Sequence, residues 1–134
     1  MLKIGVQSAG IFTPDDHDYN FRTLHEAGFE CVDFNIDTKL PGEQIRKGLP
    51  EGFFDQSVEE LCVFYAPVKA AADKYGISFS QMHGPFPLWV NDRDEDMNPY
   101  VIMATEKCIG VAAYLGCPAI VVQPVAAQLI LGWT

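Results

Sequence analysis

The chain has 134 residues, of which 49% are hydrophobic and 20% are charged, which is typical of one globular domain with its own core. Its formal net charge of −9 argues against a DNA or RNA backbone as partner, because phosphate binding requires a basic surface. No apolar run approaches the about 20 residues of a membrane span, and the N-terminus shows no signal-peptide pattern. We therefore expect a cytoplasmic protein that binds neither nucleic acid nor membranes.

The N-terminal third predicts a strand, a helix and a second strand. Lys3–Gln7 is short and apolar, and a polar loop separates it from residues with helical spacing that end at Gly28. An aspartate of that loop, or the asparagine that follows it, can cap the helix. The second strand is Glu30–Ile36, and Asn35 and Asp37 lie at its outgoing end.

The middle of the chain predicts a long loop and a long helix. Residues 38–56 are rich in proline and glycine and indicate a loop with at most one helical turn, around Gln44–Lys47. Ser57 and Glu60 have the spacing of a capping box, and apolar residues then follow on one helical face. Pro67 removes one backbone hydrogen bond from this helix, so we expect a kink or two short helices.

A third strand, Ile77–Met82, ends at His83, where a Gly-Pro pair breaks it. The acidic run Asp92–Asp96 begins like a calcium loop. It lacks the glycine and the glutamate that such a loop needs at its sixth and twelfth positions, so we reject calcium. A solvated loop or a helix entry is the better interpretation of this charge run.

The last predicted helix begins at Asn98, which precedes a proline at the first turn. Its buried stripe comprises Val101, Ala104, Cys108, Val111, Ala112 and Leu115. Glu106, Lys107 and Gly110 are predicted to face solvent. The fourth strand is Pro118–Gln123, and an apolar tail without clear periodicity follows.

The cysteines contain no closely spaced pair. They are Cys31, Cys62, Cys108 and Cys117. Each lies within a predicted strand, a helix or a helix–strand junction. We interpret them as small buried hydrophobic residues in a reducing compartment, and not as a disulfide or zinc framework.

Three helix–strand junctions share one pattern, in which a helix, a glycine and one or two further residues precede a buried strand. The glycines are Gly28, Gly76 and Gly116. Repeated βα units produce parallel strands, and long loops after the strands are typical of (β/α)₈ barrels. A flavodoxin-type sheet would need a phosphate-cradling glycine loop, of which Ser8–Gly10 is a weak version. The expected fold is α/β, with about four parallel βα units in strand order 1-2-3-4.

Polar residues occupy the outgoing ends of the predicted strands, which meet at one edge of a parallel sheet. They are Gln7, Asn35, His83 and Gln123. We expect these side chains to bind substrate, with Phe86 and Trp89 lying over them, and His83 to be the one good metal ligand. A structural histidine that is bonded to a backbone carbonyl is the alternative for His83.

Four segments of the chain, taken in order, carry a family resemblance. They are Lys3–Gln7, Ala27–Phe34, Tyr75–Phe86 and Ala112–Pro124. Together they resemble the first four βα units of the xylose isomerase-like TIM barrels, and among these the sugar phosphate isomerase/epimerase group. In that family the third strand ends in a histidine near the metal and substrate, which His83 matches. The fourth strand usually ends in His-Pro, where this chain has glutamine at position 123.

The resemblance implies isomerisation or epimerisation of a sugar or sugar phosphate. In such enzymes a divalent metal (Mn, Mg, Zn or Co) polarises a carbonyl, and paired carboxylates move a proton at the adjacent carbon. The family's catalytic glutamates come from strands 5 to 8, and a full barrel needs about 250 residues. We therefore expect residues 1–125 to be the N-terminal half of a barrel and 126–134 an atypical tail. We expect this truncated chain to bind no metal and to be inactive alone, with no catalytic residue.

A non-catalytic half-barrel is the alternative function. Open sheet edges invite pairing with another chain, so we expect the protein to form a homo-oligomer or to bind a partner through those edges. A DNA-repair endonuclease on the same barrel is a third interpretation, which the net charge of −9 opposes.

Overall fold

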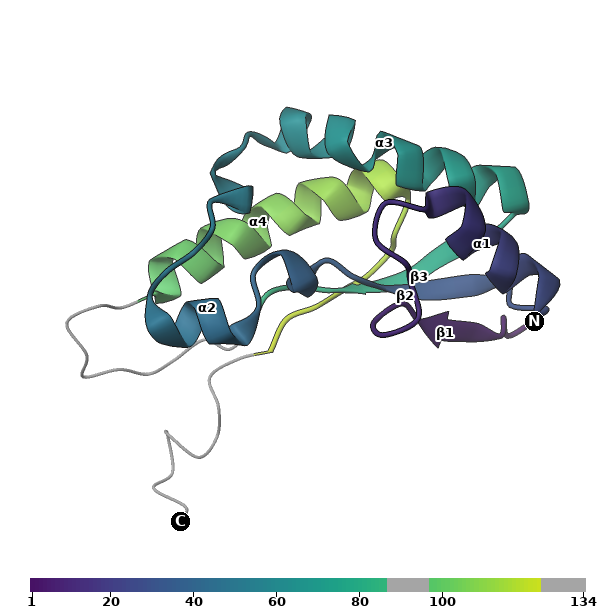
Figure 1. Ribbon diagram of the computed structural model, residues 1–134, viewed down its shortest axis with the longest axis horizontal. Coiled ribbons are helices and arrows are strands. Elements are labelled where there is room, and N and C mark those ends of the chain that lie inside the picture. Colours follow the sequence, from purple (N-terminus) through teal and green to yellow (C-terminus); the bar gives the residue numbers. More distant parts are fainter. Residues whose placement is uncertain (87–96, 124–134) are drawn as a thin grey trace, which may run out of the picture.

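The computed structural model describes residues 1–86 and 97–123. Its four strands run parallel in the order β1-β2-β3-β4, which confirms the predicted α/β arrangement. The strands are β1 (Gly5–Gln7), β2 (Cys31–Asn35), β3 (Ser78–His83) and β4 (Ile120–Val121). Figure 1 shows the three long helices on one face of the sheet, and they are α1 (His17–Glu26), α3 (Val58–Tyr75) and α4 (Asn98–Leu115).

The register of the sheet aligns the outgoing ends of the strands. Gln7 pairs with Asp33, and Asn35 pairs with His83 two residues further along. On its other side His83 pairs with Val121 of β4. An irregularity between positions 32 and 33 of β2 shifts the β2–β3 register, so the residues at the carboxyl ends face one another.

The core lies between the sheet and the three long helices. Phe34 of β2 is its centre, with its ring 5.9 Å from that of Tyr65 and 5.7 Å from that of Phe79, both in edge-on contact. The predicted stripe of α4 is buried throughout, from Val101 to Leu115, which confirms that helical pattern. Full burial of each large apolar side chain contributes roughly 1.5–3 kcal/mol.

The helix ends follow the sequence signals. The Asp16 side chain accepts a hydrogen bond from the backbone N–H of Tyr19 and caps α1. Ser57 and Glu60 form both bonds of the predicted capping box at the start of α3. Gly76 ends α3 with φ of 68°, a left-handed conformation in which a Cβ would be strained.

Two predictions about the middle of the chain need correction. Pro67 lies inside one uninterrupted helix, so the prediction of two short helices is wrong. Buried residues on both sides of the proline, from Leu61 to Ala72, pack on the core and offset the lost hydrogen bond. The helical turn expected around Gln44–Lys47 is present as α2 (Gly42–Lys47), but the rest of this segment is more ordered than the expected loop, because it also holds the 3₁₀ turns Asp37–Lys39 and Phe53–Asp55.

The expected solvent face of α4 is also partly wrong. Glu106 is exposed, but Lys107 donates hydrogen bonds of 2.7 Å to the backbone carbonyls of Phe54 and Gln56. A Cβ added at Gly110 would lie 2.6 Å from Cγ1 of Val58. These two positions therefore pack against the segment that leads into α3. Helical spacing cannot reveal such contacts, because it does not show which neighbour covers the flank of a helix.

The remaining fold predictions concern β4, the cysteines and the tail. The regular part of β4 is only Ile120–Val121, which is shorter than the predicted strand. All four cysteines are free, and three of them are buried, as expected of small hydrophobic residues. The proposed boundary at residue 125 and the tail 126–134 lie outside the described residues. Within the described ranges, no helix is both long and apolar enough to cross a membrane.

Candidate functional site

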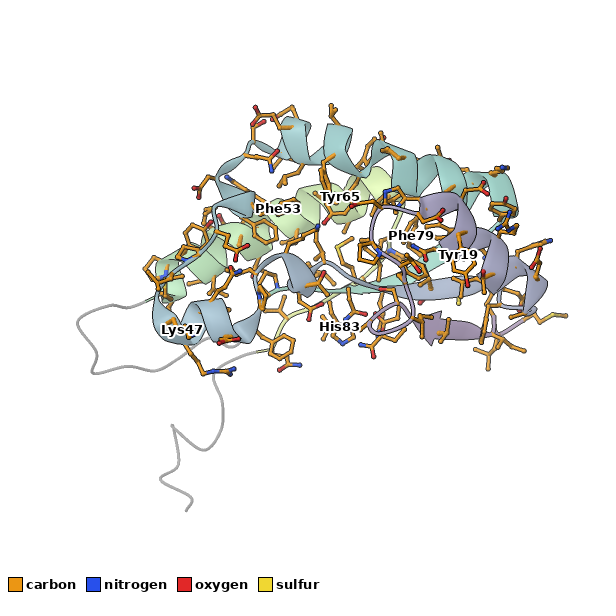
Figure 2. All side chains as sticks on the ribbon, viewed as in Figure 1. Tyr19, Lys47, Phe53, Tyr65, Phe79 and His83 are labelled. Atoms are coloured by element: carbon orange, nitrogen blue, oxygen red, sulfur yellow. The ribbon has the colours of Figure 1, made fainter. Side chains whose placement is uncertain are left out.

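A polar face of the sheet lies opposite the helices. Along β2, Val32 and Phe34 pack into the core, whereas the alternate residue Asp33 projects to the other face. His83 of β3 projects to the same face, and Figure 2 shows it on the side of the sheet away from α1, α3 and α4. The uncovered face therefore carries hydrogen-bonding groups at the carboxyl ends of adjacent strands.

A hydrogen bond between Asp33 and His83 organises this face. The distance from Oδ1 of Asp33 to Nδ1 of His83 is 2.9 Å, and both side chains are 19% exposed. Nε2 of Gln81 donates a second bond of 2.9 Å to Oδ2 of Asp33. A carboxylate can only accept, so Nδ1 of the imidazole carries the proton and Nε2 of the neutral ring keeps a lone pair.

Asn35 connects the loops after β1 and β2. Its Oδ1 accepts from the backbone N–H of Ala9 at 3.0 Å and from the hydroxyl of Ser8 at 3.3 Å, while its Nδ2 donates to Asp37 at 3.0 Å. The Ser8 hydroxyl also accepts from the backbone N–H of Asn35 at 2.9 Å. The Asn35 side chain is buried and forms three hydrogen bonds to protein partners, so it fixes the two loops beside His83.

The other predicted site residues lie around this pair. Gln7 ends β1 opposite Asp33 and is exposed, and Gln123 is exposed two residues beyond β4. Phe86 is half-buried three residues after the end of β3. Trp89 lies outside the described residues. The structure thus brings Gln7, Asn35 and His83 to one end of the sheet.

Asp33 and Gln81 were missed in the sequence. Each precedes a predicted site residue by two positions on the same strand, and residues i and i+2 of a strand share a face. That alternation would have placed Asp33 beside Asn35 and Gln81 beside His83. The pairing between the strands was still needed to show that a carboxylate lies behind the imidazole.

The described residues do not provide a complete site for a divalent metal. No group of three or more His, Cys, Asp or Glu side chains within residues 1–86 and 97–123 could hold one. A catalytic zinc needs three protein ligands and an open position, whereas His83 and its partner Asp33 supply one imidazole and the carboxylate behind it. We therefore derive no step that passes through a metal.

Comparison with known proteins identifies the fold. No protein-family model matches the chain, and no curated protein matches it. Solved structures do match, among them the 3-keto-D-glucoside 4-epimerase YcjR from E. coli in its apo form. It has a TM-score of 0.59 and 22% sequence identity, over 91% of this chain and 38% of the epimerase chain. The chain therefore matches the fold of part of a TIM-barrel sugar epimerase and spans 38% of that protein's length.

Proposed function

We propose that the protein takes part in the isomerisation or epimerisation of a sugar or sugar phosphate, and that its polar sheet face forms part of the sugar site. The observation that carries this proposal is the hydrogen bond between Asp33 and His83 at the carboxyl ends of β2 and β3. Parallel α/β folds bind their ligands at this edge. The likeness in fold to a sugar epimerase supports the choice of substrate class.

The chemistry of the pair suits a sugar. Asp33 holds the His83 ring in one orientation, so Nε2 can accept a hydrogen bond from a sugar hydroxyl, or donate one when the ring is protonated. The exposed amide of Gln7 adds a donor and an acceptor at the same edge. We assign these residues to binding and orientation. Transfer of the carbon-bound proton is assigned to none of the described residues, so we expect the chain alone to bind without turnover.

Calorimetric titration with several ketoses and keto-glucosides tests the binding role. His83→Ala should weaken binding by about tenfold, because one hydrogen bond to a desolvated hydroxyl is worth about 1–1.5 kcal/mol. His25→Ala, which removes an exposed imidazole from α1, is the matched control and should bind like the parent chain. Absence of binding by the parent chain, or equal affinity in all three proteins, would contradict the proposal.

An exchange assay tests the assignment of proton transfer. The chain is incubated with the same sugars in D₂O, and mass spectrometry measures deuterium at the carbon next to the carbonyl. We expect no incorporation by the chain alone, because no described carboxylate is assigned to move that proton. Incorporation above background would show that the catalytic groups lie among residues to which we give only a binding role.

Self-association is the second candidate function, and the exposed N-terminal edge favours it. Among the described strands β1 pairs only with β2, and next to its free edge Leu2 is 96% exposed and Ile4 is 64% exposed. An apolar open edge is a template for another strand. Sedimentation velocity at micromolar concentration should show a dimer or larger species, and Ile4→Lys should shift it toward monomer. A monomer in the parent chain would rule this function out.

A further inference from the structure

A cavity of about 240 Å³ lies at the carboxyl ends of β1 and β2, between the loop after β1, the turn Asp37–Lys39 and α3. At about 30 Å³ per water molecule, it has room for about eight waters. Asp33, Gln81 and His83 are not among the residues that line it. It is therefore separate from the polar sheet face, although Asn35 contributes to its wall.

One part of the cavity wall is aromatic, whereas the loop after β1 and the start of α1 contribute polar residues, among them Thr13, Asp15 and Asn20. Phe12, Phe34, Phe64 and Tyr65 all line it. Their rings contact one another, with 6.5 Å between the centroids of Phe12 and Phe34 and 5.0 Å between those of Phe64 and Tyr65. Such mutual contacts hold the rings in place, so the cavity presents a preformed apolar surface that favours a flat apolar group.

The charged groups at the cavity are Lys39, Asp15 and, when protonated, His17. Nζ of Lys39 lies 5.3 Å from the centroid of the Phe53 ring and 5.1 Å from that of Phe64. No carboxylate of the described residues forms an ion pair with it, although the whole chain carries a net charge of −9. The ammonium group is thus held beside the aromatic wall and is available to an anion.

Tyr65, which also lines the cavity, carries a buried hydroxyl. Tyr65 is 3% exposed, yet it forms no hydrogen bond within residues 1–86 and 97–123. Burial raises the pKa of this phenol well above its usual range, so it stays neutral and able to donate. Buried polar groups in native proteins nearly always have a partner, so we test this hydroxyl as a donor to the ligand.

We propose that this cavity binds a small aromatic carboxylic acid, with its ring against Phe34 and Phe64 and its carboxylate at Lys39. A cationic ligand is disfavoured, because the ammonium of Lys39 already lies at the Phe64 ring. The proposal does not depend on the sugar site.

Phenylacetate is the probe, and benzyl alcohol is its neutral counterpart of similar shape. Saturation-transfer NMR on the full chain measures the affinity of both. Phenylacetate should bind with a dissociation constant below about 5 mM and about tenfold more tightly than benzyl alcohol, because only the carboxylate pairs with Lys39. Lys39→Gln should abolish that preference. Lys47→Gln removes a lysine from α2 that is not in the cavity wall, and it should preserve the preference.

Three results would overturn the proposal. The first is no binding of phenylacetate at about 10 mM, and the second is equal affinity of the parent chain for the two probes. The third is an equal loss of the preference for phenylacetate in Lys39→Gln and Lys47→Gln. Tyr65→Phe should also weaken phenylacetate binding, and unchanged affinity would remove the hydroxyl from the site. Thermal melting confirms that each variant folds. If Lys39→Gln does not fold, the comparison of the two probes on the parent chain decides. His83→Ala should leave phenylacetate binding unchanged, which separates this result from the sugar site.

Discussion

The Asp33 carboxylate accepts a hydrogen bond of 2.9 Å from Nδ1 of His83 across the boundary between β2 and β3. The two residues are not register partners, since Asp33 pairs with Gln81, and His83 with Asn35. The bond is therefore diagonal, because it joins Asp33 of β2 to the residue two positions beyond its register partner on β3. It orients the imidazole on the sheet face that the helices leave uncovered (Figure 2).

Replacement of Asp33 tests the structural part of this bond. We expect Asp33→Ala to lower the free energy of unfolding by about 1–3 kcal/mol, because Nδ1 of His83 and Nε2 of Gln81 both lose their acceptor. Nitrogen-15 NMR should also show a mixture of imidazole tautomers in place of the Nδ1-protonated form. Asp73→Ala, which removes an exposed carboxylate from α3, is the control for denaturant unfolding. An unchanged tautomer would mean that Asp33 does not orient the ring.

Gly110 tests the packing between α4 and the start of α3. Alanine favours a helix by about 1 kcal/mol over glycine, but its Cβ would lie 2.6 Å from Cγ1 of Val58. We expect Gly110→Ala to destabilise the fold by about 1–3 kcal/mol, and the added change Val58→Ala to restore much of that loss. Thermal unfolding measures both. If Gly110→Ala raised the melting temperature, the two helices would not meet at this residue.

Lys107 tests the hydrogen bonds that hold the turn before α3. Lys107→Met keeps the length of the side chain but leaves the carbonyl oxygens of Phe54 and Gln56 without their 2.7 Å donors. We expect a loss of about 1.5–3 kcal/mol, since both bonds are charge-assisted. Lys47→Met, on the exposed side of α2, is the matched control. Equal stability of the two variants in urea would show that Lys107 is solvated.

Cys108 predicts how stability depends on pH. Burial raises the pKa of its thiol to about 12 from an ordinary value of 9.0, and the charge of Asp37 adds to the effect. From pH 9 to 12 the unfolded chain loses a proton that the native chain keeps, so stability falls as pH rises, by up to about 1.4 kcal/mol per pH unit. Cys108→Ala should make that slope less steep by up to about 1.4 kcal/mol per pH unit, which corresponds to one proton. If the unfolding free energy in urea depended on pH equally in the parent chain and in Cys108→Ala, this origin would be contradicted.

The sequence predicted the elements and their order because local signals determine both. The glycine at each helix end, the capping box at Ser57 and the stripe of α4 act within a few residues, and all appear in the structure. The site was predicted only in part. His83 and Asn35 stand out at strand ends, whereas the role of Asp33 depends on a register shift beside Val32 that no local pattern reveals. The contacts of Lys107 were missed for the same reason, since its acceptors lie 51 and 53 residues away.

The resonance of Nε2 in His83 provides the most direct measurement of the central claim, that the polar sheet face binds sugar. The chain is labelled with nitrogen-15 and titrated with the ketose that calorimetry shows to bind most tightly. We expect Nε2 of His83 and Nε2 of Gln81 to shift with the same dissociation constant as the calorimetric one, while His25 stays unchanged. Saturable binding that leaves His83 unshifted and moves only the amides around Lys39 would contradict the claim.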